Sequence, residues 1–228
     1  VGGLEVSVSQ SALVGIEAAF EQLHSYPWYC TEQLSSRLLP VVATSSLAKS
    51  FGVETPAVGD TKTADLISQI VSRQRSSGGF VLWNDSYTEL PWVSAYATWV
   101  LSEAKRRGEP VAEDVLARAS QYLSGLVNEQ QATELDWVYG VSALDVLAGL
   151  GHAQRADLDR WFEARERLPL FGRALLLHAL WASEGTQVRA RSLQRELENA
   201  IHLDGEIARV SENVGDKYLV VFDSPVRT

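Results

Sequence analysis

Apolar residues recur at three- and four-residue spacing along most of this chain, and this periodicity restricts its fold more than any other feature. Side chains at such spacing share one face of an α-helix. Helices are therefore predicted to dominate. The apolar stripes cover residues 13–23, 34–42, 66–71, 92–104, 113–127, 137–150, 155–167, 171–183 and 188–201, and the second stripe is interrupted at Pro40.

The segments between these stripes are short and turn-like, and short connections favour antiparallel neighbouring helices. The predicted hairpins repeat at about 40–50 residues, a period expected for helical repeats. One connection, Gln74–Phe80, contains the Gly-Gly-Phe turn that also occurs in α/α toroids, where hairpins close into a ring of inner and outer helices. The predicted fold class is all-α, an α/α toroid of antiparallel helical hairpins.

Only the C-terminal segment changes its period. Residues 206–212 and 218–222 alternate between apolar and polar side chains, and residues 213–216 between them are of turn type. Alternation with a period of two is typical of β-strands. A small β-hairpin is therefore predicted near residues 206–222.

Composition narrows the possible classes of partner. With 228 residues, of which 46% are hydrophobic, the chain can form one large domain over residues 1–228. Its net charge of −9 argues against nucleic acid, because neutralising phosphates requires clustered Lys and Arg. No apolar run reaches about 18 residues, so this segment is not expected to insert into a membrane. The chain begins at Val1 and lacks methionine, which suggests a fragment of a much larger protein.

Cys30 is the only cysteine, and Gln33 follows it by three residues. Side chains at i and i+3 of a helix lie on one face, about 5–6 Å apart at Cβ. The Cys30 sulfur can then attack the Gln33 side-chain carbonyl, and loss of ammonia leaves an internal thioester. Such a bond is a stored electrophile, which acylates an attacking amine or hydroxyl once and releases the thiol.

The residues around this pair have two possible roles each. Glu32 is predicted to orient the turn or to form a local hydrogen bond, although an isolated glutamate is more often solvated. Tyr26, Trp28 and Tyr29 are either ordinary core aromatics or side chains that keep water from the acyl bond. The two roles of the aromatic residues are compatible.

Residues 26–40 read YPWYCTEQLSSRLLP. This segment resembles the thioester segment of bacterial α2-macroglobulins, which are relatives of complement and animal α2-macroglobulin. In that family a Tyr-Pro-aromatic lead, here Tyr26, Pro27 and Trp28, precedes a Cys-x-Glu-Gln core and a Ser-Arg-Leu helix. The family commonly has glycine immediately before the cysteine, where this chain has Tyr29.

The resemblance covers nearly the whole chain. Residues 74–80, 91–97, 173–177 and 224–228 are also similar to stretches of the family's thioester domain. Family members begin another helix where this chain stops at Thr228. The toroid is therefore expected to be incomplete at its C-terminus.

The resemblance implies a protease-trapping inhibitor and not an enzyme. The thioester would acylate lysines of an attacking protease, after cleavage of a bait segment in another domain of the same parent chain. Export to the periplasm, with a lipid anchor on the parent, and a role in bacterial defence are also implied. Complement-type relatives carry a histidine that first accepts the acyl group, but the comparable stretch here, Asn128–Gln131, has none. Direct attack by amines is therefore expected, with no cofactor or metal.

Other functions remain open at this stage. A helical-toroid interaction module without a thioester is one, and a thiol enzyme in which a distant histidine activates Cys30 is another. The four histidines, His24, His152, His178 and His202, show no metal-type pairing. A zinc-dependent prenyltransferase of similar fold would need such ligands. A toroid glycosidase would need paired carboxylates, for which the candidates are Asp85, Glu89, Glu134 and Asp136.

Overall fold

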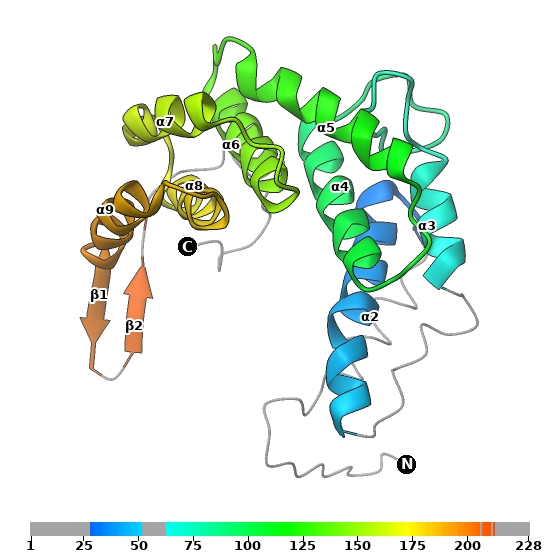
Figure 1. Cartoon of the computed structure of the whole chain (residues 1–228), viewed down its shortest axis with the longest axis horizontal. Helices are drawn as coiled ribbons and strands as arrows, with labels where there is room; N and C mark the ends of the chain where they lie inside the picture. Colours follow the sequence, from blue (N-terminus) through cyan, green and yellow to red (C-terminus); the bar gives the residue numbers. More distant parts are fainter. Residues whose placement is uncertain (1–27, 52–62, 206, 211, 213–228) are drawn as a thin grey trace, which may run out of the picture.

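The structure, a computed structural model, describes residues 28–51, 63–205, 207–210 and 212. Helices dominate these residues, which confirms the predicted all-α class (Figure 1). The elements are α2 (Thr31–Phe51), α3 (Thr63–Val71), α4 (Pro91–Arg106), α5 (Glu113–Asn128), α6 (Glu134–Gly149), α7 (Arg155–Glu163), the 3-10 helix η1 (Arg165–Arg167), α8 (Leu170–Ala182), α9 (Gln187–Glu198), β1 (Ile201–Asp204) and β2 (Ile207–Val210).

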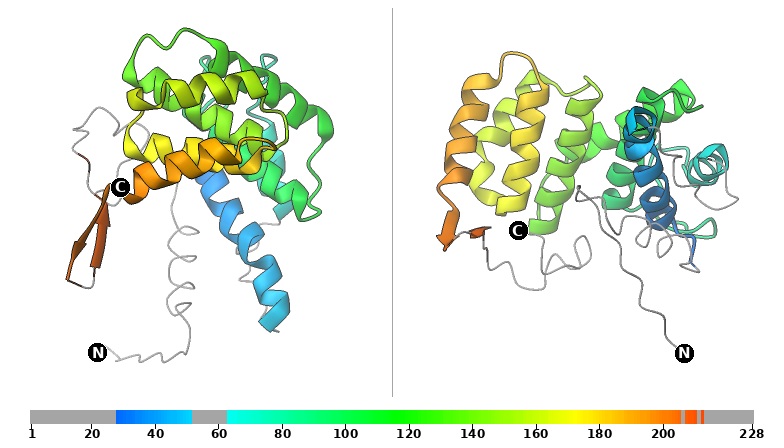
Figure 2. Two further views of the ribbon diagram at one scale, coloured as in Figure 1. Left: turned by 60° about the vertical axis from the view of Figure 1, so that its left-hand side comes forward. Right: turned by 90° about the horizontal axis from the view of Figure 1, so that it is seen from below.

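The helices form two layers, as a toroid requires. Helices α2, α4, α6 and α8 contact one another in that order and make the inner layer. Helices α3, α5, α7 and α9 pack outside them, each against the inner helices next to it in the chain. The described helices follow an open arc with α2 at one end and α9 at the other, and Figure 2 shows the arc from below.

Local sequence explains where these helices begin and end. Pro91 starts α4, where a residue without an N–H is tolerated, and Gly108 follows its end with a positive φ of 89°. At the start of α6, Thr133 and Asp136 exchange side-chain to backbone hydrogen bonds as a capping box. Helix α2, by contrast, continues through Pro40 to Phe51, so the predicted interruption at Pro40 is wrong.

The core consists of two apolar clusters that meet at α4 and α5. The first cluster joins α2, α3, α4 and the start of α5, and includes Leu34, Leu38 and Phe80. The second joins the end of α5 to helices α6–α9, and includes Leu144, Trp161 and Leu180 among its buried residues. Continuous packing around the arc holds the start of α2 against α4.

A small antiparallel β-hairpin is present, and its second strand coincides with the first predicted strand, 206–212. Strands β1 and β2 pair antiparallel, with Ile201 opposite Val210 and Asp204 opposite Ile207. The turn contains Gly205, whose φ is +63°, directly after Asp204. Asp-Gly between apolar runs is a strong hairpin signal. The predicted turn at 213–216, the predicted second strand, 218–222, and the stripe at 13–23 lie outside the described residues.

Candidate functional site

Cys30 and Gln33 meet at the first turn of α2. The Cys30 carbonyl accepts the hydrogen bond of the Leu34 N–H at 2.9 Å, so Cys30 is the N-cap residue and Gln33 is the third residue of the helix. The Cys30 N–H in turn donates to the Gln33 side-chain oxygen at 3.3 Å. This is half of a capping box, in which the third helical residue reaches back to the N-cap. It brings the carboxamide to the residue that carries the sulfur.

The start of α2 is attached to the loop that follows α3. The Thr31 N–H donates to the Leu82 carbonyl at 2.9 Å, and the Thr31 hydroxyl donates to the Val81 carbonyl at 2.5 Å. Thr31 is fully buried. Because backbone and side chain are both anchored, the first turn of α2 has little freedom to move. Thr31 is the variable residue of the Cys-x-Glu-Gln motif, and no local sequence pattern indicates this anchoring role.

Glu32 connects the motif to α4. Its carboxylate accepts the Ser36 hydroxyl at 2.8 Å, and the Ser36 oxygen lies 3.0 Å from the Tyr96 hydroxyl. Burial raises the pKa of Tyr96 above its ordinary value, so the phenol stays protonated near neutral pH. The other carboxylate oxygen of Glu32 lies 3.9 Å from the Cys30 sulfur. Glu32 therefore makes the predicted local hydrogen bond and also faces the thiol.

The two described aromatic residues directly before Cys30 do not belong to the core. Trp28 is 60% exposed and Tyr29 is 48% exposed, so neither is a core aromatic in the described structure. The guanidinium carbon of Arg37 lies 4.2 Å from the centre of the Tyr29 ring, a cation–π contact. Tyr26 and Pro27 lie outside the described residues.

The Cys30 thiol is buried, and its pKa is raised above the ordinary value of a cysteine. Its residue is only 6% exposed. Burial raises the pKa of the thiol, and the Glu32 carboxylate adds to that effect, whereas the backbone N–H groups of Gln33 and Glu32 and the Arg73 charge lower it. A reactive catalytic cysteine has the opposite character, a lowered pKa and an open approach.

No imidazole among the described residues is positioned to activate this thiol. Two of the histidines hydrogen-bond to side chains of α5 and α6, and the third is exposed on β1 (His152, His178 and His202). His24 lies outside the described residues. The geometry therefore gives no support to a thiol enzyme.

One cavity borders the motif and is lined only by inner helices. We call it the inner cavity; its volume is about 420 Å³. Glu32 of α2, Trp92, Tyr96 and Trp99 of α4 and Asp145 of α6 contribute to its wall. Burial raises the pKa of Asp145, and the hydrogen bond and charge of His178 oppose that shift. The cavity offers an approach to the motif from inside the arc.

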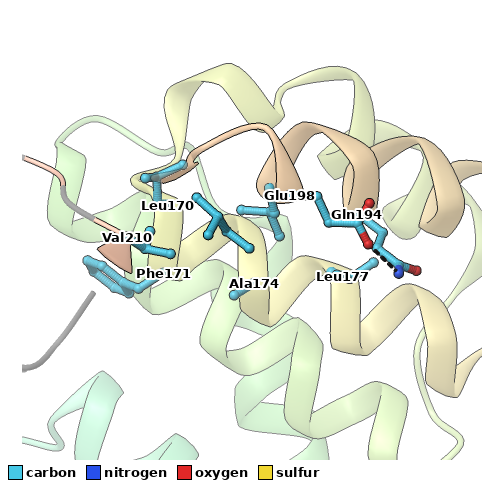
Figure 3. A pocket seen from close by; sticks show the side chains of 9 residues that line it. Leu170, Phe171, Ala174, Leu177, Gln194, Glu198 and Val210 are labelled. Atoms are coloured by element: carbon cyan, nitrogen blue, oxygen red, sulfur yellow. Dashed lines mark hydrogen bonds between the residues drawn. The ribbon is translucent and has the colours of Figure 1, made fainter. Parts of the chain in front are cut away.

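A second cavity lies at the other end of the arc. We call it the C-terminal cavity; it measures about 410 Å³ and is lined mainly by apolar side chains of α8, α9 and the hairpin (Figure 3). Its polar residues, Gln194 and Glu198, hydrogen-bond to each other at 2.9 Å. This lining provides no nucleophile or acid–base pair.

The carboxylates proposed for a glycosidase are not brought together. Asp136 caps its own helix and Glu89 accepts the Ser77 hydroxyl at 2.7 Å. Asp85 and Glu134 are exposed. None of the four lines the inner or the C-terminal cavity.

The described residues contain neither a metal-type cluster nor a membrane-spanning helix. The described residues contain no group of three or more His, Cys, Asp or Glu side chains that could hold a metal ion. None of the helices in the described part of the chain is long and apolar enough to cross a membrane.

Arg73 is the residue that sequence reasoning missed. It is only 6% exposed, and its Nη1 lies 3.4 Å from the Thr31 hydroxyl and 3.5 Å from the Leu82 carbonyl oxygen. It therefore lies beside the first turn of α2. No local pattern indicates this, since 42 residues separate Arg73 from Thr31.

Comparisons with known proteins support the resemblance. The chain is 29% identical over 119 residues to an alpha-2-macroglobulin homolog of Yersinia pestis, covering 52% of this chain and 6% of that protein. It is 30% identical over 117 residues to the alpha-2-macroglobulin of Escherichia coli K12, covering 48% of this chain and 7% of that protein. The chain thus spans a small part of these relatives. No protein-family model matches it.

The fold has a solved counterpart. The structure of Salmonella alpha-2-macroglobulin reacted with methylamine matches 83% of this chain and 13% of that chain, with a TM-score of 0.67 and 25% identity. The curated relatives and the solved neighbours are thus bacterial alpha-2-macroglobulins, as the residues around Cys30 predicted.

Proposed function

We propose that residues 1–228 form the thioester domain of a bacterial protease-trapping inhibitor, with the Cys30 sulfur joined to the side-chain acyl carbon of Gln33. The observation that carries this proposal is the hydrogen bond from the Cys30 N–H to the Gln33 side-chain oxygen at 3.3 Å. It holds the carbonyl of the electrophile at the residue that bears the nucleophile. The matches to bacterial alpha-2-macroglobulins support the same assignment.

The same N–H has a chemical role in the proposed reaction. A donor aimed at a carbonyl oxygen polarises the carbonyl and stabilises the oxyanion that forms when its carbon is attacked. The positive end of the α2 dipole adds to this effect. When Cys30 attacks, ammonia leaves Gln33; when an amine attacks later, the carbon–sulfur bond breaks and an amide remains. Each molecule reacts once, so the domain is a trap and not an enzyme.

Burial of Cys30 and access from the inner cavity fit such a trap. A buried sulfur is protected from water, which would hydrolyse the acyl bond. The inner cavity reaches Glu32 and provides a route for an amine. In the absence of a histidine at 128–131, a lysine of the captured protease is the expected acceptor. The exposed Trp28 and Tyr29 would be covered, if at all, by other parts of the parent protein.

The proposal extends to the parent protein. Proteolysis of a bait segment elsewhere in that protein would expose the thioester, and capture would be covalent. The expected location is the periplasm or another exported compartment. The structure of a methylamine-reacted Salmonella relative supports reactivity toward primary amines in this group of proteins.

Intact mass of the freshly purified protein that carries this chain tests the proposal. We expect a mass lower by one ammonia than the sequence requires, no titratable Cys30 thiol, and incorporation of one methylamine with release of that thiol. Cys30→Ala and Gln33→Ala are the matched controls, which should show neither the ammonia loss nor the methylamine adduct. A native protein with unmodified mass and a Cys30 thiol indifferent to methylamine contradicts the proposal.

The second candidate is a helical interaction module without a thioester. The apolar C-terminal cavity favours it, because an open apolar surface of this kind can receive a partner. This candidate predicts an unmodified mass, and the same measurement separates the two functions.

A further inference from the structure

Among the described residues, the guanidinium of Arg73 is buried without an anionic partner. Its two hydrogen bonds, to Thr31 and Leu82, are long at 3.4 and 3.5 Å, and both go to neutral oxygens. Its Nε atom is buried without a hydrogen-bond partner in the described structure. Within the described residues Arg73 forms no ion pair with a carboxylate.

Such a group is costly unless a negative charge compensates it. Burying an unpaired charge costs several kcal/mol by the usual order of magnitude. Many ionisable groups avoid this cost by losing their charge, but arginine keeps its proton in proteins. Burial does lower the pKa of Arg73, and the nearby Cys30 opposes that shift. An anion that forms close to this buried guanidinium would therefore be stabilised by it.

The backbone fixes where the Arg73 charge lies. The Arg73 N–H donates to the Ile70 carbonyl at 3.0 Å at the end of α3, and the Arg73 carbonyl accepts the Val81 N–H at 3.2 Å. The guanidinium is thus held at Thr31, the residue directly after Cys30. Two charged groups act on the pKa of the Cys30 thiol: Arg73, whose Nη1 lies 3.4 Å from the hydroxyl of the neighbouring Thr31, and Glu32, whose carboxylate lies 3.9 Å from the sulfur.

We propose that Arg73 stabilises the Cys30 thiolate that leaves when an amine opens the thioester. This inference rests on the proposed function. In the step, the amine nitrogen forms a bond to the Gln33 acyl carbon, and the carbon–sulfur bond breaks with its electron pair going to sulfur. The nitrogen loses a proton to water or buffer, and the thiolate is held by the guanidinium until it takes up a proton. The negative charge of Glu32 acts against the thiolate, so Arg73 supplies the compensating charge.

A purely structural role would look different. In that case Arg73 would only connect Thr31 to Leu82, and its replacement would lower the melting temperature without changing the acidity of Cys30. The pKa of the thiol is therefore the measurement that separates the two roles. It can be obtained even if no thioester forms.

The first experiment uses Gln33→Ala in the protein that carries this chain, where Cys30 stays a thiol whatever the parent function. The rate of iodoacetamide alkylation of Cys30 is followed against pH, with and without Arg73→Gln. Removing an opposite charge at close range raises a thiol pKa by about one unit or more. Alkylation below that pKa should then slow about tenfold. Gln keeps N–H donors for Thr31 and Leu82, which limits loss of folding.

Arg75→Gln is the matched control. Arg75 lies in the same loop, but its guanidinium donates to the Asn84 and Ser86 carbonyls at 2.8 Å each. This variant removes a positive charge from the loop and should leave the alkylation profile unchanged. Arg73→Lys, which keeps the charge, should stay closer to the unsubstituted profile than Arg73→Gln does.

The second experiment measures methylamine-dependent thiol release in the protein with Gln33 present. Arg73→Gln should slow release about threefold or more, because a more basic thiolate leaves more slowly. An unchanged alkylation profile in a folded Arg73→Gln variant overturns the inference, even if thiol release is slowed. A missing thioester in the unsubstituted protein overturns the proposed function, whereas a raised thiol pKa in Arg73→Gln would still confirm the pairing of Arg73 with the sulfur. If Arg73→Gln does not fold, Arg73→Lys replaces it. An alkylation profile of Cys30 equal to that of the protein with Arg73 supports the charge role, and a profile displaced to higher pH overturns it.

Discussion

The two ends of the arc are built from different interactions. Around α2, α3 and α4, which we call the α2–α4 region, polar side chains are buried; they are Thr31, Ser35, Arg37, Arg73, Ser94 and Thr98. In the α6–α9 region the buried polar side chain is Thr186, and the interior is otherwise made of Leu, Ala, Val and Trp. Ion pairs of this second region, such as Arg155–Asp159, lie nearer the surface.

This difference shows which region must hold its side chains in one fixed geometry. Apolar packing has no directional requirement and tolerates small shifts. Buried hydrogen bonds fix distances and angles, and they are costly when one partner is lost. The α2–α4 region therefore holds the first turn of α2 in one geometry, and the α6–α9 region supplies bulk stability. Substitutions in the two regions test this division between precise geometry and bulk stability.

Gly78→Ala should have the largest effect on stability, because it distorts the loop that anchors α2. Gly78 has a φ of +96°, and an added Cβ would lie 2.0 Å from the Arg118 carbonyl oxygen. We expect a loss of about 4 kcal/mol or more in the free energy of unfolding, measured by urea denaturation. Gly108→Ala is the control: its φ is +89° but its Cβ position is open, so it should cost only about 1 kcal/mol. Equal losses in the two variants would show that the close contact with α5 is unimportant.

Leu144→Ala should destabilise the α6–α9 region without preventing formation of the proposed thioester. Leu144 is fully buried in the second cluster. Truncating a buried leucine costs about 2–5 kcal/mol, measured by urea denaturation. At a temperature where the variant remains folded, intact mass should still show the ammonia loss expected for the proposed thioester. Loss of the thioester in folded Leu144→Ala would contradict the division between the regions.

Thr31→Val should reduce the fraction of protein with the proposed thioester, while it lowers stability less than Leu144→Ala does. It removes the hydroxyl that binds the Val81 carbonyl but keeps the side-chain shape. The stability loss should be about 1–3 kcal/mol, since a buried acceptor is left unpaired. The fraction of molecules with the thioester mass should fall, although stability falls less than in Leu144→Ala. Ser35→Ala is a useful control because its hydroxyl bonds only the preceding turn, at Thr31 O. Normal thioester content in Thr31→Val would show that this anchor is dispensable.

Asp145→Asn should have the smallest effect, and its sign depends on pH. Burial raises the pKa of Asp145 in the folded protein, so the folded state binds the proton more tightly than the unfolded chain. Stability from this group is present at low pH and is lost as pH rises through the raised pKa. At pH 7 the neutral amide should therefore raise the melting temperature slightly, and the difference should vanish below about pH 4. A lower melting temperature at pH 7 would indicate that the bond to His178 outweighs the cost of burying the carboxylate.

The sequence predicted what depends on local spacing. Helices α4 and α5 begin and end within two residues of the predicted stripes, because their apolar faces and end signals agree. Cys30 and Gln33 were identified for the same reason, since three residues of helix bring them together. Strand β1 was not predicted, because the Asp204–Gly205 turn signal before residue 206 was passed over.

What the sequence could not predict depends on contacts between distant segments. Pro40 was expected to interrupt its helix, but packing of Leu38 and Val42 in the first cluster carries α2 through it. Trp28 and Tyr29 were expected in the core or as shields of the acyl bond, and both are exposed among the described residues. Arg73 had no signal at all, because its significance arises only where the end of α3 meets Thr31.

The capping arrangement at Cys30 also limits how this segment can vary in length. The Gln33 side chain reaches the Cys30 N–H because three helical steps place residues 30 and 33 on one face. One residue deleted between them would place the carboxamide only two steps from Cys30, about 200° around the helix axis and away from the sulfur. Loops elsewhere in the arc can gain or lose residues at modest entropic cost. At this turn such a deletion would prevent the proposed ring closure while leaving the helix itself intact.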